Sequence, residues 1–295
     1  MNQKEAKHQG GQSRMSDKLK GVEALRLIIY QPQAHYRVPF TYQRRHTYPL
    51  PSYSAVRGLL CNILGIRGDT FGENPEEKED FRNLKNLKIG ICGRFEAKTT
   101  ECTWLRNLSK TEHIKTFGAV ENRVRFGVGE HPGGQSPVLI DVLNEVRIVV
   151  YLAHEDSSFL EKLSQKIQNP VGRLYPLYLG RAEDWVVVEE IKPVSLKVES
   201  KDAHFEHFFW VPEKPCLLDI PFDFEKVQGL RYRVPIFWEL REDGELREGG
   251  SRNFRYVSAK LNDGRFQGVS FLFDKSFGRK GLPVFLAGME GINGV

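Results

Sequence analysis

The chain has 295 residues, of which 40% are hydrophobic, and its 43 basic and 38 acidic side chains leave a net charge of +5. This length and apolar content allow one large or two modest domains, and so mild a charge does not by itself indicate a nucleic-acid partner. No apolar run approaches the roughly 18 residues of a membrane span, so we expect a soluble, cytoplasmic protein without a membrane partner.

The N-terminal part predicts a leader, a strand and a helix. Residues 1–22 are polar and are expected to form a disordered leader. The apolar run Ala24 to Tyr30 predicts a buried central strand. Further on, Ser52 stands at the N-cap position of a predicted helix that Gly65 ends. One face of this helix is apolar at helical spacing, through Val56, Leu59, Leu60, Ile63 and Leu64.

The middle of the chain alternates strand and helix patterns. Residues 73–80 contain five acids and are expected to form an exposed connection. Leu87 to Ala97 predicts a strand, and the basic, glycine-rich residues 105–135 predict a protruding hairpin. Val146 to Ala153 and Trp185 to Ile191 predict two further strands around a short amphipathic helix.

This order of elements is strand, helix, strand, strand, helix, strand, which is the split βαβ plan of an α+β fold and of the RNA-recognition module. After about residue 200, short β-like pieces are separated by turn signals. We therefore expect three parts: the leader 1–22, a first domain 23–199, and a β-rich second domain 200–295. An extension of the first sheet is the alternative for the third part.

A stretch without any acidic residue runs from Ala24 to Gly68, where the chain average would place about six acids. It carries six arginines and six interleaved aromatic residues, a combination that suits phosphates and unpaired bases. The alternative is a solvated basic surface with tyrosines in the core. The predicted RNA-contacting positions here are Tyr36, Arg37, Arg44, Arg45, His46, Tyr48, Ser52, Tyr53 and Arg57.

The start of the predicted helix offers free backbone N–H groups that could hold a phosphate. Gly58, within the same helix, would let another backbone come close, either from a ligand or from a packed sheet.

In these residues the chain resembles the CRISPR-associated RAMP proteins of the Cas-five family, whose members cap the crRNA 5′ handle in type I Cascade complexes. The most specific piece is YPLPSYSAVRGLLCNILG, from Tyr48 to Gly65. The preceding strand and basic loop, the later strand VLNEVRIVVYLA and the turn VGRLYPLYLGRAEDWV add to the likeness, which covers about residues 24–195. The type I-B branch is the most similar.

The resemblance implies a ferredoxin-like or RRM-like domain with a β-hairpin thumb and a smaller C-terminal β-rich domain. It also implies a non-catalytic subunit that grips the crRNA 5′ handle without a cofactor and joins the Cascade backbone and large subunits in antiviral defence. Target DNA is a further candidate partner. Arg123 and Arg125 in the thumb are expected to contact RNA or the adjacent backbone subunit. Arg181 is expected either to reach RNA or a neighbouring subunit, or to pair with Glu183 or Asp184.

One branch of this family cuts crRNA with a Tyr, Lys and His set in which Lys and His are adjacent. Here the only adjacent pair is Lys7-His8, in the predicted leader, while His113 near Lys115 and His46 beside Arg45 are the remaining acid–base candidates. We therefore predict no catalytic residue, and keep a metal-independent endoribonuclease that processes precursor crRNA as the alternative.

No metal site is predicted. The four cysteines have neither CxxC spacing nor a nearby histidine set, which argues against zinc and favours a reducing compartment. The carboxylates of Asp141, Glu145, Asp156 and the Glu189-Glu190 pair show no ligand spacing and are expected to lie on the surface or to cap helices.

Overall fold

The structure is a computed structural model that describes residues 21–39, 41–66, 74–107, 124–125, 128–129, 134–169, 171–240 and 252–291. The predicted leader lies outside these residues except for its last two, of which Val22 opens the first strand. Helices and a dominant sheet are combined, in agreement with the predicted α+β class.

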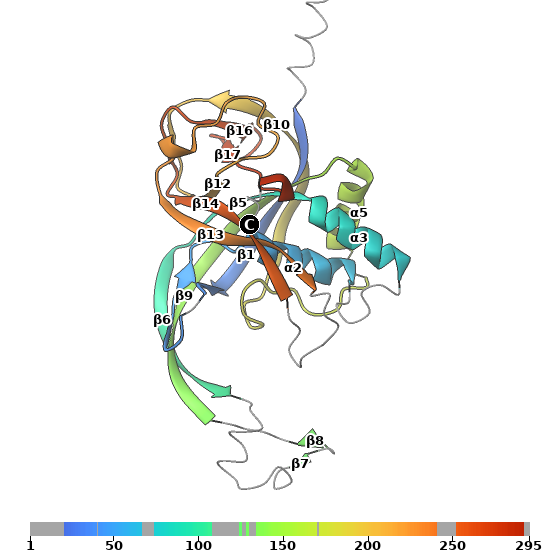
Figure 1. Cartoon of the computed structure of the whole chain (residues 1–295), viewed down its shortest axis with the longest axis vertical. Helices are drawn as coiled ribbons and strands as arrows, with labels where there is room; N and C mark the ends of the chain where they lie inside the picture. The colour runs from blue at the N-terminus through green and yellow to red at the C-terminus, as the bar shows by residue number, and fades with distance from the viewer. Residues whose placement is uncertain are drawn as a thin grey trace, which may run out of the picture.

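Four antiparallel strands form the centre of the sheet, in the spatial order β5-β9-β1-β10 (Figure 1). Their bounds are Val22–Ala34 for β1, Lys88–Arg94 for β5, Gly134–Ala153 for β9 and Val187–Ser200 for β10. Each predicted strand is present, although β1 and β9 are much longer than the apolar runs that predicted them, because their ends continue into polar residues that still pair with neighbours.

Helix α2, Tyr53–Leu64, confirms the predicted helix. The Ser52 hydroxyl accepts a hydrogen bond from the Ala55 N–H, which satisfies one of the free donors at the helix start. Gly65 ends the helix in the left-handed conformation, at φ 78°, which a residue with a Cβ adopts only with strain. All five predicted apolar residues face the core, four of them fully buried.

Helix α3, Pro75–Asn86, replaces the exposed connection predicted at 73–80. Asn74 caps it by accepting from the Glu76 N–H, and Pro75 fits the first helical position because its missing N–H is not needed there. Two of the acids that suggested a connection, Glu76 and Glu77, lie in the first turn, at the positive end of the helix dipole. Another of these acids, Asp80, is buried and pairs with Lys162 at 2.7 Å.

Helix α5, Ser157–Gln168, is the amphipathic helix expected after β9. Asp156 caps it by accepting a hydrogen bond from the Ser158 N–H. Helix capping was one of the two roles predicted for this carboxylate. Phe159, Leu163 and Ile167 are buried against the sheet.

A two-stranded arm extends from the main body where β6, Ala97–Asn107, pairs with the first half of β9 (Figure 1). The short strand β3, Arg44–Arg45, lies parallel to β9 on its other side. Most of the predicted hairpin tip lies outside the described residues, apart from the backbone of the paired strands β7, Val124–Arg125, and β8, Val128–Gly129.

The C-terminal residues continue the same sheet from both of its edges. Strands β12, β14 and β13 add beyond β5, and β16 and β17 add beyond β10. This continuity favours the sheet extension over a separate domain at 200–295. Their bounds are β11 Ala203–His204, β12 Phe208–Pro212, η3 Phe224–Lys226, β13 Leu230–Leu240, β14 Arg252–Asn262, β15 Arg265–Phe266, β16 Ser270–Asp274, β17 Leu282–Val284 and η4 Met289–Gly291.

The extension curls over the sheet and closes on it. Just after β17, Ala287 exchanges two backbone hydrogen bonds of 2.9 Å with Ile89 of β5. Apolar side chains are thus buried on both faces of the sheet, because side chains alternate between its faces. One face packs on α2, α3 and α5, and the other packs on a phenylalanine-rich cluster: Phe205, Phe209, Phe266, Phe271, Phe273 and Phe285.

Candidate nucleic-acid interface

The basic loop, residues 35–48, leaves the end of β1 and returns to the start of the segment before α2; Phe40 within it lies outside the described residues. Its two ends pair as β2, Tyr36–Arg37, and β4, Thr47–Tyr48. Between them, the Leu139 N–H donates to the carbonyl of Gln43 at 2.9 Å and fastens the loop to β9. The loop is therefore held along the root of the two-stranded arm.

Several basic side chains of the basic loop are exposed to solvent. The side chains of Arg44 and His46 are 54% and 50% exposed, and Arg37 is also exposed. Lys98, which β6 places beside them, is 52% exposed. Tyr42 is 73% exposed and is the aromatic residue of this loop best placed to stack on a base.

The carboxylate of Asp141 on β9 lies beneath these cations and is 1% exposed. Its oxygens lie 2.9 Å from His46 Nδ1, 3.5 Å from Arg44 Nη2 and 3.8 Å from Lys98 Nζ. Burial alone would raise the pKa of Asp141, but the hydrogen bond from His46 and the charges of Lys98 and Arg44 outweigh it and hold that pKa below its usual value. The expectation of a surface or capping carboxylate is corrected, because three strands enclose this side chain.

Arg45 and Arg37 add positive charge that is not neutralised locally. The half-buried Arg45 has a lowered pKa, first because burial disfavours its charge and second because of the nearby Arg37 charge. Arg45 Nε is buried without a hydrogen-bond partner. Among the residues that the structure describes, no acidic side chain forms an ion pair with either arginine. An anion is the partner that would satisfy both.

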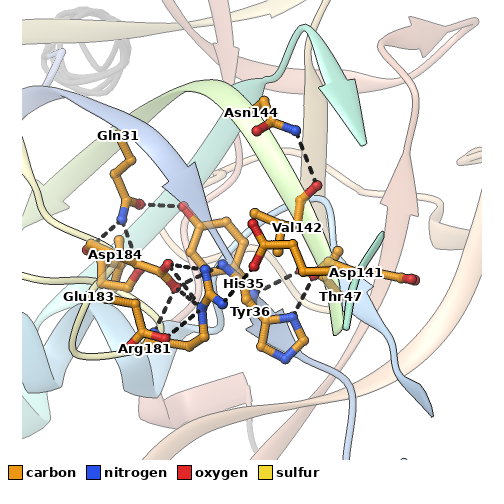
Figure 2. Close-up of polar contacts among 12 residues, drawn as sticks. Gln31, His35, Tyr36, Thr47, Asp141, Val142, Asn144, Arg181, Glu183 and Asp184 are labelled. Atoms are coloured by element: carbon orange, nitrogen blue, oxygen red, sulfur yellow. Dashed lines mark hydrogen bonds and ion pairs between the residues drawn. The ribbon is translucent and has the colours of Figure 1, made fainter. Parts of the chain in front are cut away.

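Three predicted RNA-contacting side chains are instead buried, and their assignment is corrected. Tyr36 is 4% exposed and donates its hydroxyl to Gln31 at 2.6 Å (Figure 2). Tyr53 is completely buried in the core. Arg57 is 1% exposed and donates to three backbone carbonyl oxygens inside the protein. None of these side chains is accessible to RNA in this structure.

Tyr48 and the start of α2 are also part of the packed interior rather than a phosphate seat. Tyr48 is half-buried and its ring meets those of Trp210 and Tyr232 edge-on. The Trp210 indole donates to the carbonyl of Pro51 at 2.9 Å, so it covers the approach to the helix start. The Ser52 hydroxyl caps the helix and also lies 3.1 Å from the hydroxyl of Ser54.

Arg181 forms the salt bridge that was one of its two predicted roles. Its guanidinium lies 2.8 Å from Asp184, which is itself buried, and 3.5 Å from both Glu183 and Glu101 (Figure 2). Asp184 also accepts from the His35 N–H, which ties this turn to the start of the basic loop. Arg181 is thus neutralised and is not part of the free positive charge.

The remaining candidates do not join this interface. Gly58 is exposed with open space around it, so neither backbone nor sheet approaches it. His113, Lys115 and Arg123 lie outside the described residues, as does the Lys7-His8 pair, and only the backbone of Arg125 is described. Over the described ranges, no cluster of three or more His, Cys, Asp or Glu side chains could hold a metal ion, and no helix is long and apolar enough to cross a membrane.

Sequence reasoning did not select Lys98 or Asp141. Both become visible only through the pairing of β6 with β9, which places Thr100 opposite Asp141 and brings Lys98 to the same surface. The signal that could have found them is an acid in the middle of a β-branched strand, flanked by Ile140 and Val142.

Comparison with known proteins finds one family model that is similar to part of the chain. The family model described as CRISPR-associated protein (Cas_Cas5) matches residues 24–130, which include the basic loop, α2, β5 and β6. No curated protein matches the chain.

Three solved structures are similar at low identity. A chain of a CRISPR RNA-guided surveillance complex is 14% identical over 82% of this chain and 90% of that one, with a TM-score of 0.48. A CRISPR protein from Archaeoglobus fulgidus is 16% identical over 92% and 100%, with a TM-score of 0.36, and a Cas protein is 15% identical over 82% and 95%, with a TM-score of 0.37. At these TM-scores the likeness does not establish a shared fold. The type I-B branch stays a prediction. The match over residues 24–130, which is less than half of the chain, confirms that this part resembles the CRISPR-associated proteins of the Cas-five family.

Proposed function

We propose that this chain is a non-catalytic, crRNA-binding subunit of a type I Cascade effector, and that its basic loop together with Lys98 holds the crRNA 5′ handle. The observation that carries this proposal is the gathering of exposed cations around one buried carboxylate. Arg37, Arg44, Arg45 and Lys98 bring four basic side chains to this surface, and among the residues that the structure describes the buried acid that pairs with two of them is Asp141. A surface of this kind favours the phosphates of a short single strand.

The strand order supports an RRM-like central module, since β5-β9-β1-β10 is the order that the split βαβ plan produces. In an RRM, bases stack on the sheet face opposite the helices. Here that face is covered: Tyr151 is 1% exposed and its hydroxyl donates to Asp274 of the C-terminal extension. We therefore place the RNA along the basic loop and the root of the arm, not across the sheet.

The backbone and large subunits of Cascade, and target DNA, are proposed as the further partners of this chain on the strength of its family. The thumb hairpin is the proposed contact to the backbone subunit; its root is the arm formed by β6 and β9.

The proposal is tested by measuring the affinity of the purified chain for handle RNA over a series of salt concentrations. The double variant Arg44→Ala, Arg45→Ala should bind more weakly, and its slope of log K against log salt should be shallower by about 1.4, because each phosphate contact of a single strand contributes about 0.7. The control is Arg231→Ala, Arg265→Ala, which removes the same charge from exposed arginines of β13 and β15. Equal losses in both double variants would contradict a specific interface.

A metal-independent endoribonuclease is the second candidate, because the structure pairs His46 Nδ1 with the buried Asp141 at 2.9 Å. A histidine oriented by a carboxylate in this way can act as a general acid or base through its other nitrogen. Incubation of the chain with repeat RNA in EDTA decides between the candidates. Site-specific cleavage that is lost in His46→Gln would establish the nuclease. RNA that stays uncleaved would rule out the nuclease and favour the binding function.

A further inference from the structure

An acidic residue inside a surface that binds RNA should weaken binding, since it repels phosphates. Asp141 is nevertheless built into the middle of the proposed interface and is almost completely buried. We propose that Asp141 is a positioning residue for RNA binding, which sets the shape of the basic loop from both ends and fixes the directions of its cations. This inference rests on the function proposed above.

Asp141 holds both ends of the basic loop. Its backbone carbonyl accepts from His35 Nδ1 at 2.7 Å (Figure 2). Its carboxylate forms a hydrogen bond with His46 Nδ1 at 2.9 Å. His35 must carry its proton on Nδ1, because a carbonyl oxygen only accepts. His35 is 4% exposed, and burial lowers its pKa. Two histidines eleven positions apart are therefore fastened to one residue of the rigid strand β9.

The same carboxylate restrains the side chains that face solvent. Thr100 Oγ1 donates to it at 3.3 Å, while Arg44 and Lys98 approach at 3.5 and 3.8 Å and keep about half of their surface exposed. Long basic side chains lose much conformational freedom when they bind a ligand. Cations that are already directed by a buried charge lose less of it, which favours binding through preorganisation.

The buried position of the Asp141 carboxylate also limits how strongly it repels RNA phosphates. Because Asp141 lies under the cations, a phosphate outside would meet Arg44 and Lys98 first. The carboxylate is enclosed by its partners, so its negative charge interacts mainly with them and only weakly with the ligand.

The test uses two isosteric substitutions that each remove one negative charge. Asp141→Asn should weaken the binding of handle RNA about tenfold and make the salt slope shallower, because the cations are no longer held in place. Asp219→Asn removes the same charge from an exposed site and should leave the affinity unchanged or slightly higher. If charge alone mattered, both variants would bind at least as tightly as the parent chain, and that result would overturn the proposal.

A double-mutant cycle separates positioning from a general loss of structure. Lys98→Met should cost less affinity in the Asp141→Asn background than in the parent chain, because Asp141 acts in part through Lys98. Strict additivity of the two losses would count against the inference. Should Asp141→Asn not fold, Thr100→Val removes one donor to the same carboxylate and must weaken RNA binding at least twofold. An unchanged affinity in that variant refutes positioning by Asp141.

The two proposals fail in different ways. If the parent chain does not bind handle RNA, or if Arg44→Ala, Arg45→Ala binds as tightly as the parent chain, the proposed function itself is wrong. If the arginine variant loses affinity while Asp141→Asn keeps it, only the positioning role of Asp141 falls.

Discussion

Replacement of Arg57 by methionine is expected to destabilise the protein without weakening its grip on RNA. Arg57 donates to the carbonyl oxygens of Leu84, Leu87 and Ile236, so one guanidinium links α2 to the end of α3, the start of β5 and β13. Burial lowers the pKa of Arg57 to about 10, which leaves it charged at neutral pH. The side chain therefore acts as an internal cross-link.

The size of the effect follows from these three bonds. Hydrogen bonds to a charged group contribute about 1.5–3 kcal/mol each, and methionine would leave three buried carbonyls unpaired. Loss of the buried charge returns part of its desolvation cost, so we expect a net loss of about 3–5 kcal/mol. For a chain of this size that corresponds to a fall in Tm of about 6–10 °C.

The assay is urea and thermal unfolding followed by tryptophan fluorescence, with RNA affinity measured well below the transition. Arg82→Met, on the exposed side of α3, is the matched control and should change the free energy of unfolding by less than about 0.5 kcal/mol. A variant Arg57→Met that keeps its Tm but loses RNA affinity would refute this reasoning and return Arg57 to the interface.

Two further predictions concern the C-terminal extension. Burial, with the Arg94 charge, lowers the pKa of His207 to about 4. As pH falls, the imidazole of His207 is protonated in the unfolded chain before it is protonated in the folded one. The free energy of unfolding therefore decreases below about pH 6.5, by about 2 kcal/mol at pH 5. Measurements of unfolding at pH 7 and pH 5 check this, and His207→Gln should lose less stability between the two. Gly264→Ala should destabilise the protein by more than about 3 kcal/mol, because Gly264 has φ 92° and an added Cβ would overlap the carbonyl oxygen of Phe205. The matched control is Gly268→Ala, which has φ 59° but open space around it and should cost about 1 kcal/mol. Equal melting temperatures for the two alanine variants would contradict the overlap.

The elements with complete local signals were predictable from the sequence. Helix α2 has an N-cap at Ser52, a regular apolar face and a terminating Gly65, and all three signals act within the helix itself. Helix α3 was missed because its acids outweighed the weaker signals of Asn74 and Pro75, although acids in a first helical turn are favourable.

The candidate site was predictable only in part, because burial of a polar side chain depends on distant partners. The acid-free segment correctly located a basic, partly exposed loop that includes Arg44. The same pattern could not tell Arg44 from Arg57, whose partners come from three other elements. Asp141 and Lys98 meet only through the register of β6 and β9, which no local pattern specifies.

The backbone pairing between Ile89 and Ala287 has a consequence for how the protein is made. These two residues are separated by almost 200 positions, and such distant pairings slow folding because a long loop must close first. On the ribosome, β5 and β9 emerge well before the phenylalanine-rich strands that shield their second face. The nascent chain must therefore carry an unprotected apolar surface until its last strands arrive, a period in which aggregation competes with folding.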